Sequence, residues 1–262
     1  MTPIVLFRKS LADEGEFDVC RKYFSTIEYR SQVFFTSPVN INDKLLVIPR
    51  YSALPYYQEL EKDVNNLGGS LINSYEQHKW IANFEWYEPL KQFTPKTYFD
   101  YNFFSAPNDQ RYVVKGATNS RKNQWNSMMF AQNKQDALRI AADLKNDGLI
   151  CNQDIIYREY VPLQTYEIGV NGLPFTNEWR FFFYKEELLT YGYYWSIAYQ
   201  PLKIIEQRAI DFAKRMAHII SHYTNFFVID IGKSIEDRWY IIELNDGCMS
   251  GLSECSADEL YG

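Results

Sequence analysis

Two neighbouring apolar runs near the C-terminus, Phe226-Phe-Val-Ile-Asp-Ile-Gly232 and Trp239-Tyr-Ile-Ile-Glu-Leu-Asn245, predict an antiparallel hairpin. Both runs are rich in β-branched and aromatic residues, yet each carries polar side chains. Glu243 and Asn245 lie two residues apart, so they point to the same face of their strand. If the register pairs Asp230 with Glu243, three hard oxygen donors converge, which suits Mg²⁺ bridging to a phosphate. The sequence leaves open this register and the alternative, a hairpin whose polar residues face water.

Composition limits the classes of protein to which the chain can belong. Its 262 residues are 46% hydrophobic, so it can bury a large core, in one long domain or in two to three small ones. The formal net charge of −6 argues against a broad surface that follows phosphates. Nucleic acid is therefore not an expected partner.

Neither a membrane segment nor a secretory signal is expected. No run approaches the roughly 20 apolar residues of a membrane span, and the segment Met1–Ser10 lacks the layout of a signal peptide. The four cysteines form no CxxC pair, which is typical of reduced intracellular thiols rather than of a zinc site or disulfide framework. We therefore expect a cytoplasmic protein without a membrane partner.

The N-terminal third has the pattern of a small Rossmann-like domain. A strand is expected at Lys44–Ile48, a helix at Pro55–Leu67 and a strand at Ser70–Asn73, which together form a βαβ unit. Further strands are expected at Ile4–Phe7 and Gln32–Thr36. The dinucleotide fingerprint G-x-G-x-x-G is absent.

Arg50 comes directly after the carboxyl end of one of these strands, where such sheets bind ligands. It is therefore a candidate for binding an acidic substrate, and an ordinary surface arginine is the alternative. The segment Tyr87–Pro107 carries three prolines and little periodicity, so we expect a linker there.

A second group of features suits a phosphate. The expected strand Arg111–Gly116 ends in Lys115 and Gly116 and runs into the polar loop Ala117–Trp125. A lysine at a strand end beside a small-residue loop can hold a phosphate as a point charge, helped by loop N–H groups. The loop is not a Walker A motif, and a solvated loop is the alternative reading.

Two later strands add candidate contacts. The expected strand Asp154–Pro162 ends in Glu159-Tyr160-Val161, whose backbone groups can read an adenine edge, although any edge strand offers such groups. The segment Glu178–Tyr184 alternates cleanly, with Glu178, Arg180 and Phe182 on one face. Arg180 in such an aromatic strand needs an anionic ligand or an internal carboxylate partner.

Helices are expected at Asn133–Asn146 and at Pro201–His222. In the first, Asn133 is the expected N-cap, and Leu138, Ala141 and Leu144 are the expected apolar stripe. Both helices are assigned a packing role.

In this order the features resemble the ATP-grasp superfamily, in particular a small branch found in phages and bacteria whose members mostly lack an assigned substrate. The resemblance covers about residues 48–251. It is carried by four motifs: Val114-Lys-Gly116, Tyr157-Arg-Glu-Tyr-Val-Pro162, Glu178-Trp-Arg180, and Val228-Ile-Asp230 with Ile242-Glu-Leu-Asn245. It implies an α+β or α/β chain with the ATP-grasp fold, in which a Rossmann-like domain at 1–95 precedes an ATP-grasp domain at 96–262. Within the latter, a lid lobe at about 108–160 and a C-terminal lobe at about 161–262 would clamp ATP.

The resemblance also implies roles for single residues. Lys115 would hold the α- and β-phosphates, with Lys122 in the closing loop as a further contact. Glu159, with the backbone of Tyr160 and Val161, would hold the adenine. Arg180 would steady the γ-phosphate or an acyl-phosphate. The Mg²⁺ ligands would be Asp230, Glu243 and Asn245.

The function implied is an ATP- and Mg²⁺-dependent ligase that joins a small-molecule or peptide carboxylate to an amine through an acyl-phosphate. Two alternatives remain open: a kinase or end-activating enzyme on the same fold, and a nucleotide-binding interaction protein without turnover. The usual glycine-rich phosphate loop is reduced here to Gly116 in a basic, Asn-rich stretch. Neither substrate can be identified from the sequence.

Overall fold

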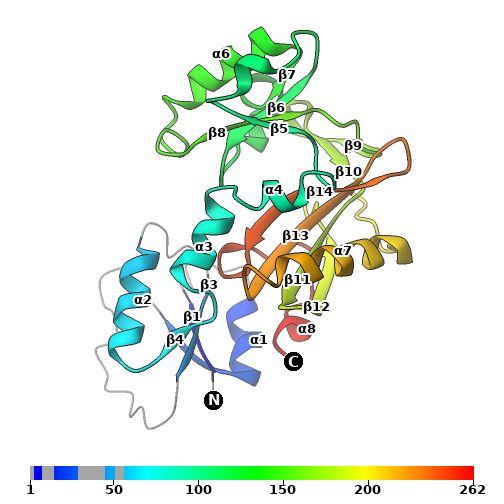
Figure 1. Cartoon of the computed structure of the whole chain (residues 1–262). Helices are drawn as coiled ribbons and strands as arrows, with labels where there is room; N and C mark the ends of the chain where they lie inside the picture. The colour runs from blue at the N-terminus through cyan, green and yellow to red at the C-terminus, as the bar shows by residue number, and fades with distance from the viewer. Residues whose placement is uncertain (1–2, 8–14, 29–44, 51–55) are drawn as a thin grey trace.

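The computed structural model describes residues 3–7, 15–28, 45–50 and 56–262. Four parallel strands form an N-terminal sheet in the order β2-β1-β3-β4 (Figure 1). The strands are β1 (Pro3–Phe7), β2 (Ser25–Glu28), β3 (Leu46–Arg50) and β4 (Ser70–Leu71), and the helices beside them are α1 (Glu16–Tyr23) and α2 (Tyr57–Asn66). The parallel pairing of β3 with β4 across α2 confirms the expected βαβ unit. The strand expected at Gln32–Thr36 lies outside the described residues.

A second, antiparallel sheet has the order β5-β8-β6-β7, and we call it and its helices the lid lobe. Its elements are β5 (Thr97–Phe99), β6 (Tyr112–Gly116), α5 (Trp125–Met128), β7 (Phe130–Ala131), α6 (Lys134–Leu144) and β8 (Ile155–Glu159). The helix α6 covers one face, because its buried side chains share a core with Tyr112, Val114 and Tyr157. The linker expected at Tyr87–Pro107 is wrong, since this segment holds α4 (Tyr87–Leu90) and the edge strand β5.

A third sheet, with the order β12-β11-β13-β14, is the centre of what we call the C-terminal lobe. Its elements are β11 (Glu178–Tyr184), β12 (Glu187–Tyr193), α7 (Gln207–Ile220), β13 (Phe226–Lys233), β14 (Trp239–Asp246) and α8 (Ala257–Tyr261), beside a small hairpin of β9 (Thr165–Ile168) and β10 (Pro174–Thr176). The helix α7 begins later than expected, because the chain is still extended at its N-cap Glu206.

Alternation along β11 decides what packs on each face of the C-terminal sheet. Trp179, Phe181 and Phe183 share a core with the buried face of α7. Phe182 points the other way and packs with residues of the N-terminal region and of α8, among them Phe7 and Tyr261. The sheet is therefore covered on both faces, and its strands read as nearly continuous apolar runs for that reason.

The helix α3 (Tyr75–Ala82) joins the N-terminal sheet to the rest of the molecule and was not expected from the sequence. It begins at a capping box of Ser74 and Gln77, which is a recognisable start signal. Ile81, and Phe84 and Trp86 after it, share the core of the C-terminal sheet, so this segment packs on the C-terminal lobe. None of the helices in the described ranges is long and apolar enough to cross a membrane.

Candidate functional site

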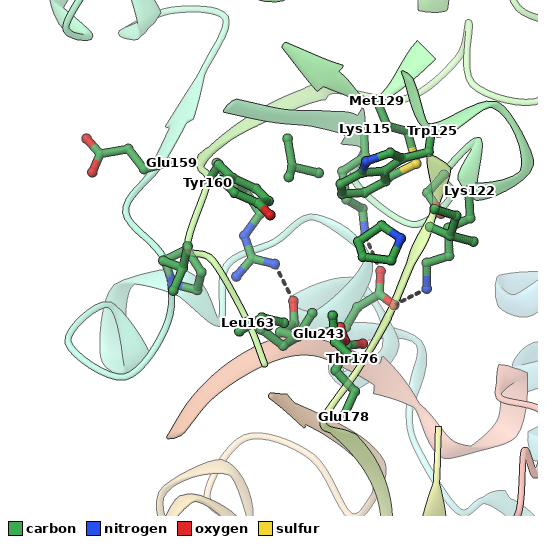
Figure 2. A pocket seen from close by; sticks show the side chains of 18 of the residues that line it. Lys115, Lys122, Trp125, Met129, Glu159, Tyr160, Leu163, Thr176, Glu178 and Glu243 are labelled. Atoms are coloured by element: carbon green, nitrogen blue, oxygen red, sulfur yellow. Dashed lines mark hydrogen bonds and ion pairs between the residues drawn. The ribbon is translucent and has the colours of Figure 1, made fainter. Parts of the chain in front are cut away.

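A cavity lies between the lid sheet and the C-terminal sheet (Figure 2). It encloses about 820 Å³ of empty space, part of it open to solvent, which is the size range of small-molecule sites. Much of its wall is apolar, formed by Trp125, Met129, Leu163, Leu173 and Ile242. We call it the apolar cavity.

Two lysines and a glutamate meet at the inner end of this cavity. Lys115 on β6 hydrogen-bonds to Glu243 Oε1 on β14, and Lys122 Nζ in the lid loop lies 3.9 Å from Glu243 Oε2. Figure 2 shows both lysines reaching Glu243 from the lid side. The cluster thus connects the two lobes through charge.

The charges in this cluster are coupled. Burial alone favours a neutral Glu243, but Lys115 and Lys122 outweigh it and hold the pKa of this carboxyl well below its usual range. Burial acts in the opposite direction on Lys115, where it lowers the pKa while Glu243 raises it. Two cations around one carboxylate leave an excess of positive charge, which suits a polyanionic ligand.

The register expected for the hairpin is confirmed. Asp230 on β13 lies opposite Glu243 on β14, and Val228 lies opposite Asn245. Asp230, Glu243 and Asn245 therefore lie along one face of the hairpin. The alternative with polar residues facing water does not hold for Asp230, which is 1% exposed.

Arg180 on β11 pairs directly across the sheet with Asp230. The pair is bidentate, with Nε 2.9 Å from Oδ1 and Nη2 2.8 Å from Oδ2, and Nη1 donates to the Gly251 carbonyl at 2.7 Å. Although burial disfavours the charged guanidinium, Asp230 raises the pKa of Arg180 above its ordinary value. The internal carboxylate partner that the sequence left open for Arg180 is therefore Asp230, while Glu178 accepts from Thr176 Oγ1 at 2.5 Å.

The donor set of this face fits a hard cation. Asp230 and Glu243 supply carboxylate oxygens and Asn245 an amide oxygen, which are ligand types that Mg²⁺ takes together with phosphate oxygens. No three His, Cys, Asp or Glu in the described ranges are grouped to hold a metal by themselves. A Mg²⁺ here would therefore depend on Asn245 and on phosphate oxygens of a ligand.

The segment Glu159-Tyr160-Val161 lines the apolar cavity, but its groups differ in availability. The Glu159 side chain points away from the lysine cluster (Figure 2) and accepts a hydrogen bond from Tyr98 at 3.1 Å. The backbone N–H of Tyr160 donates to the Arg111 carbonyl at 2.8 Å. The N–H of Val161 has no hydrogen-bond partner among the described residues, so it is available to a ligand.

The sequence interpretation missed Arg158, which lies in the wall of the apolar cavity. Its guanidinium donates to the Ile242 carbonyl, to Thr94 Oγ1 and to the Ile241 carbonyl, the last at 3.3 Å. Burial lowers the pKa of Arg158 to about 10. A charged residue within the expected strand Asp154–Pro162 was the available signal.

A second cavity adjoins the first and shares Ser120, Lys122 and Glu243 with it. We call it the polar cavity. Its wall also includes residues of α3, of the lid loop, of the β14 end and of the loop that follows β14, among them His78, Asn119, Gln153, Arg180, Tyr194, Asn245, Asp246 and Ser250. The lysine–glutamate cluster therefore lies at the junction of the two cavities.

Arg50 corrects the sequence interpretation, because the structure buries it instead of presenting it to a substrate. Its side chain is 0% exposed, and Nη2 lies 2.7 Å from Glu16 Oε1. It also donates to the Gly247 carbonyl, to the Ser250 carbonyl at 2.9 Å and to the Tyr261 hydroxyl at 3.1 Å. The expected role of Arg50 in substrate binding is wrong, since these partners fix the guanidinium inside the protein.

Comparison with known proteins identifies the fold. Residues 106–262 match a family model described as an ATP-grasp domain, the third family of its clade, and no curated protein matches the sequence. Among solved structures, D-cycloserine synthetase DcsG has a TM-score of 0.61 at 12% identity, covering 99% of this chain and 96% of that chain.

Two further solved structures are similar. The ATP-grasp ligase PsnB, complexed with a phosphomimetic variant of minimal precursor, Mg and ADP, has a TM-score of 0.58 at 10% identity, over 100% of this chain and 96% of that chain. D-alanyl-alanine synthetase A from Vibrio cholerae has a TM-score of 0.55 at 12% identity, over 99% and 92%. At these identities the likeness concerns the fold. The family model spans more than half of the chain, and the protein therefore belongs to this family of ATP-grasp domains.

Proposed function

We propose that this protein is an ATP- and Mg²⁺-dependent ligase that joins a carboxylate to an amine through an acyl-phosphate. The observation that carries the proposal is the position of Lys115, Lys122 and Glu243 at the junction of an apolar and a polar cavity. An apolar cavity suits a base, a polar one suits substrates, and the cluster between them suits a triphosphate. The similar proteins named above are synthetases and a ligase, which supports this class of reaction.

In this proposal the apolar cavity takes the adenine, with the Val161 N–H available to its edge. Lys115 and Lys122 neutralise phosphate charge, because phosphoryl transfer depends mainly on positioning and charge stabilisation. Bound Mg²⁺, held by Asp230, Glu243 and Asn245, would supply further neutralisation at the phosphates. Arg180, which is fixed by Asp230, steadies the phosphoryl group that moves to the carboxylate.

An acyl-phosphate hydrolyses easily, so the site must exclude water while the acceptor attacks. Lys122 belongs to the lid loop and contacts Tyr194 and Glu243 of the C-terminal lobe. Through these contacts the loop closes over the junction of the cavities. This arrangement favours transfer to a second substrate over loss to water.

Calorimetry with Mg²⁺ and a non-hydrolysable ATP analogue tests the proposal. We expect Mg²⁺-dependent binding to the wild-type protein. Glu243→Gln should weaken it by roughly 10- to 100-fold, the effect of losing a charged ligand worth about 1.5–3 kcal/mol. The matched control is Glu88→Gln, since Glu88 is exposed and pairs only with Lys91 in the described structure.

Wild-type protein that binds no nucleotide in the presence of Mg²⁺ contradicts the proposal. If binding is found, amino acids and short peptides are screened as carboxylates and amines for ADP release. An amide product supports the ligase, whereas a stable phosphorylated acceptor identifies a kinase instead. Nucleotide binding without any ADP release favours the interaction protein.

A further inference from the structure

A buried histidine from α3 lies in the wall of the polar cavity. His78 is 3% exposed, and its Nδ1 lies 2.9 Å from Oδ2 of Asp246, the last residue of β14. The other oxygen, Asp246 Oδ1, accepts from Asn73 Nδ2 at 2.9 Å and from the Cys248 backbone N–H at 2.8 Å. A carboxylate in this position acts as an acceptor, so the proton between it and the imidazole belongs on Nδ1.

The second ring nitrogen of His78 is left without a partner. Nε2 is buried and has no hydrogen-bond partner among the described residues. The ring stacks on Tyr57, with centroids 4.3 Å apart and planes 10° apart, which fixes its orientation. A buried polar atom without a partner costs about 1–3 kcal/mol. In a cavity wall, such an atom points to a ligand that would complete it.

The wall of the polar cavity combines two kinds of chemistry. Lys122 and Arg180 are cations that suit an anionic acyl-phosphate. His78, held by Asp246, presents the lone pair of a neutral imidazole, which suits a proton donor. An aliphatic amine reaches neutral solution as an ammonium ion and has no lone pair for attack until it loses a proton. A base beside the electrophile removes this obstacle.

We propose that the polar cavity binds a primary amine as the acceptor and that His78 Nε2 takes a proton from it. This inference rests on the ligase function proposed above. The ammonium gives one proton to Nε2, and the freed nitrogen bonds to the acyl carbon. The carbon–oxygen bond to phosphate then breaks, with its electron pair leaving on the phosphate oxygen. The phosphate takes the second nitrogen proton, and the imidazolium releases its own to water. Asp246 is a positioning residue that holds the ring and stabilises its charged form.

The first test reads the tautomer of His78 directly in the wild-type protein by long-range ¹H–¹⁵N NMR of the imidazoles. The chain has three histidines, and His218 and His222 are exposed, so the signals missing from His78→Gln assign His78. We expect a neutral ring with the proton on Nδ1, with and without Mg²⁺ and the ATP analogue. A ring with the proton on Nε2 overturns the proposal.

The second test compares two nucleophiles with the same carboxylate panel. Hydroxylamine is largely unprotonated at neutral pH and needs no base, whereas amino acids and other aliphatic amines do. His78→Gln should therefore reduce amide formation by roughly 10²- to 10⁴-fold, the usual contribution of a general base, and largely retain hydroxamate formation. Asp246→Asn should reduce amide formation in the same selective way. The matched control is His218→Gln, which changes an exposed histidine on α7 that pairs with Glu186.

Equal loss with both nucleophiles, in a variant that still binds Mg²⁺ and the ATP analogue, overturns the role of proton acceptor. So does unchanged amide formation. Wild-type protein that binds no Mg²⁺ and ATP analogue contradicts the ligase function itself. The NMR result reports on His78 in either case, because it needs no substrate and the wild-type fold is intact.

Discussion

Three buried carboxyl groups near the cleft have different surroundings and therefore different acidities. Glu243 lies between two lysines, and Asp230 is held by a bidentate arginine. Glu178 receives a hydroxyl hydrogen bond from Thr176 instead. Burial raises the pKa of Glu178 to about 7, and the charges of Asp230 and Glu243 add to this effect.

The pKa of Glu178 predicts a pH-dependent stability. Lys122 and the Thr176 hydroxyl lower this pKa, Asp230 and Glu243 raise it, and burial dominates. Because the folded pKa lies above the unfolded value of 4.5, the folded state binds the proton more tightly. Stability from this group is present below about pH 4.5 and is lost as the pH rises through 7.

Glu178→Gln, which cannot ionise, should therefore gain stability over the wild type between about pH 5 and pH 8, by roughly 3 kcal/mol for the full shift. Urea unfolding of the nucleotide-free protein at several pH values measures this difference. Glu187→Gln, at an exposed position of β12, is the control and should follow the wild type. A difference between Glu178→Gln and wild type that does not change with pH would contradict the prediction.

At the scale of elements, the loop after β6 is held by a side chain from the lid lobe. Gln153 Oε1 accepts from the backbone N–H groups of Thr118 at 3.0 Å and Asn119 at 3.1 Å, and from Thr118 Oγ1 at 2.9 Å. Converging N–H groups of this kind are typical of anion-binding loops. Gly116 permits the arrangement, because a Cβ there would lie 2.6 Å from Gln153 Oε1.

Gly116→Ala should therefore displace Gln153 and loosen the loop. We expect a stability loss of about 1–3 kcal/mol, as for other overpacked sites, together with weaker binding of the ATP analogue. Thermal unfolding and calorimetry measure the two effects. Gly148→Ala is the matched control, since a Cβ at Gly148 has no atom within 4 Å, and it should leave both quantities nearly unchanged. Unaltered nucleotide affinity in Gly116→Ala would show that the loop does not contact the phosphates.

At the scale of the whole molecule, a buried polar network joins the N-terminal region to the C-terminal lobe. Arg50 on β3 connects Glu16 of α1 with the carbonyls of Gly247 and Ser250 after β14, and with Tyr261 of α8. The Tyr261 hydroxyl also contacts Glu16 Oε1 at 2.5 Å. The network lies away from the junction of the two cavities and holds the regions that frame it.

Arg50→Met should destabilise the protein by about 3–5 kcal/mol, because it leaves the buried Glu16 without its cation. If the protein remains folded, the affinity for the ATP analogue should stay close to that of the wild type. Urea unfolding and calorimetry measure the two quantities. Lys22→Met is the matched control, since Lys22 and Asp258 join the same helices through exposed side chains and contribute about 1 kcal/mol or less. A small loss of stability in Arg50→Met would contradict the role of the network.

How well single features were predicted depends on how local their causes are. The alternation of β11 and the cap of α6 at Asn133 were correctly predicted, because strand and helix periodicity are properties of neighbouring residues. Leu138 was expected in the apolar stripe of α6, yet it is 51% exposed. The stripe instead contains Ala137 and Ile140, since the orientation of a helix is set by what it packs against.

The site divides in the same way. The hairpin and its convergent Asp230, Glu243 and Asn245 followed from two apolar runs and the spacing of their polar residues, once the register was known. Arg158, the His78–Asp246 pair and the burial of Arg50 did not follow. Each depends on partners far away in the chain, and one sequence does not show which distant backbone carbonyl or carboxylate will meet a given side chain.

The sequence by itself determined the strands, most helices and the order of the charged residues that identify the ATP-grasp family, because these depend on local periodicity and on short motifs. Only the tertiary structure decided which charges meet. It placed Lys115 and Lys122 at Glu243, paired Arg180 with Asp230, and buried Arg50 with Glu16. The physical reason is that a buried charge must find its partner in space, and that partner is chosen by how the sheets pack rather than by distance along the chain.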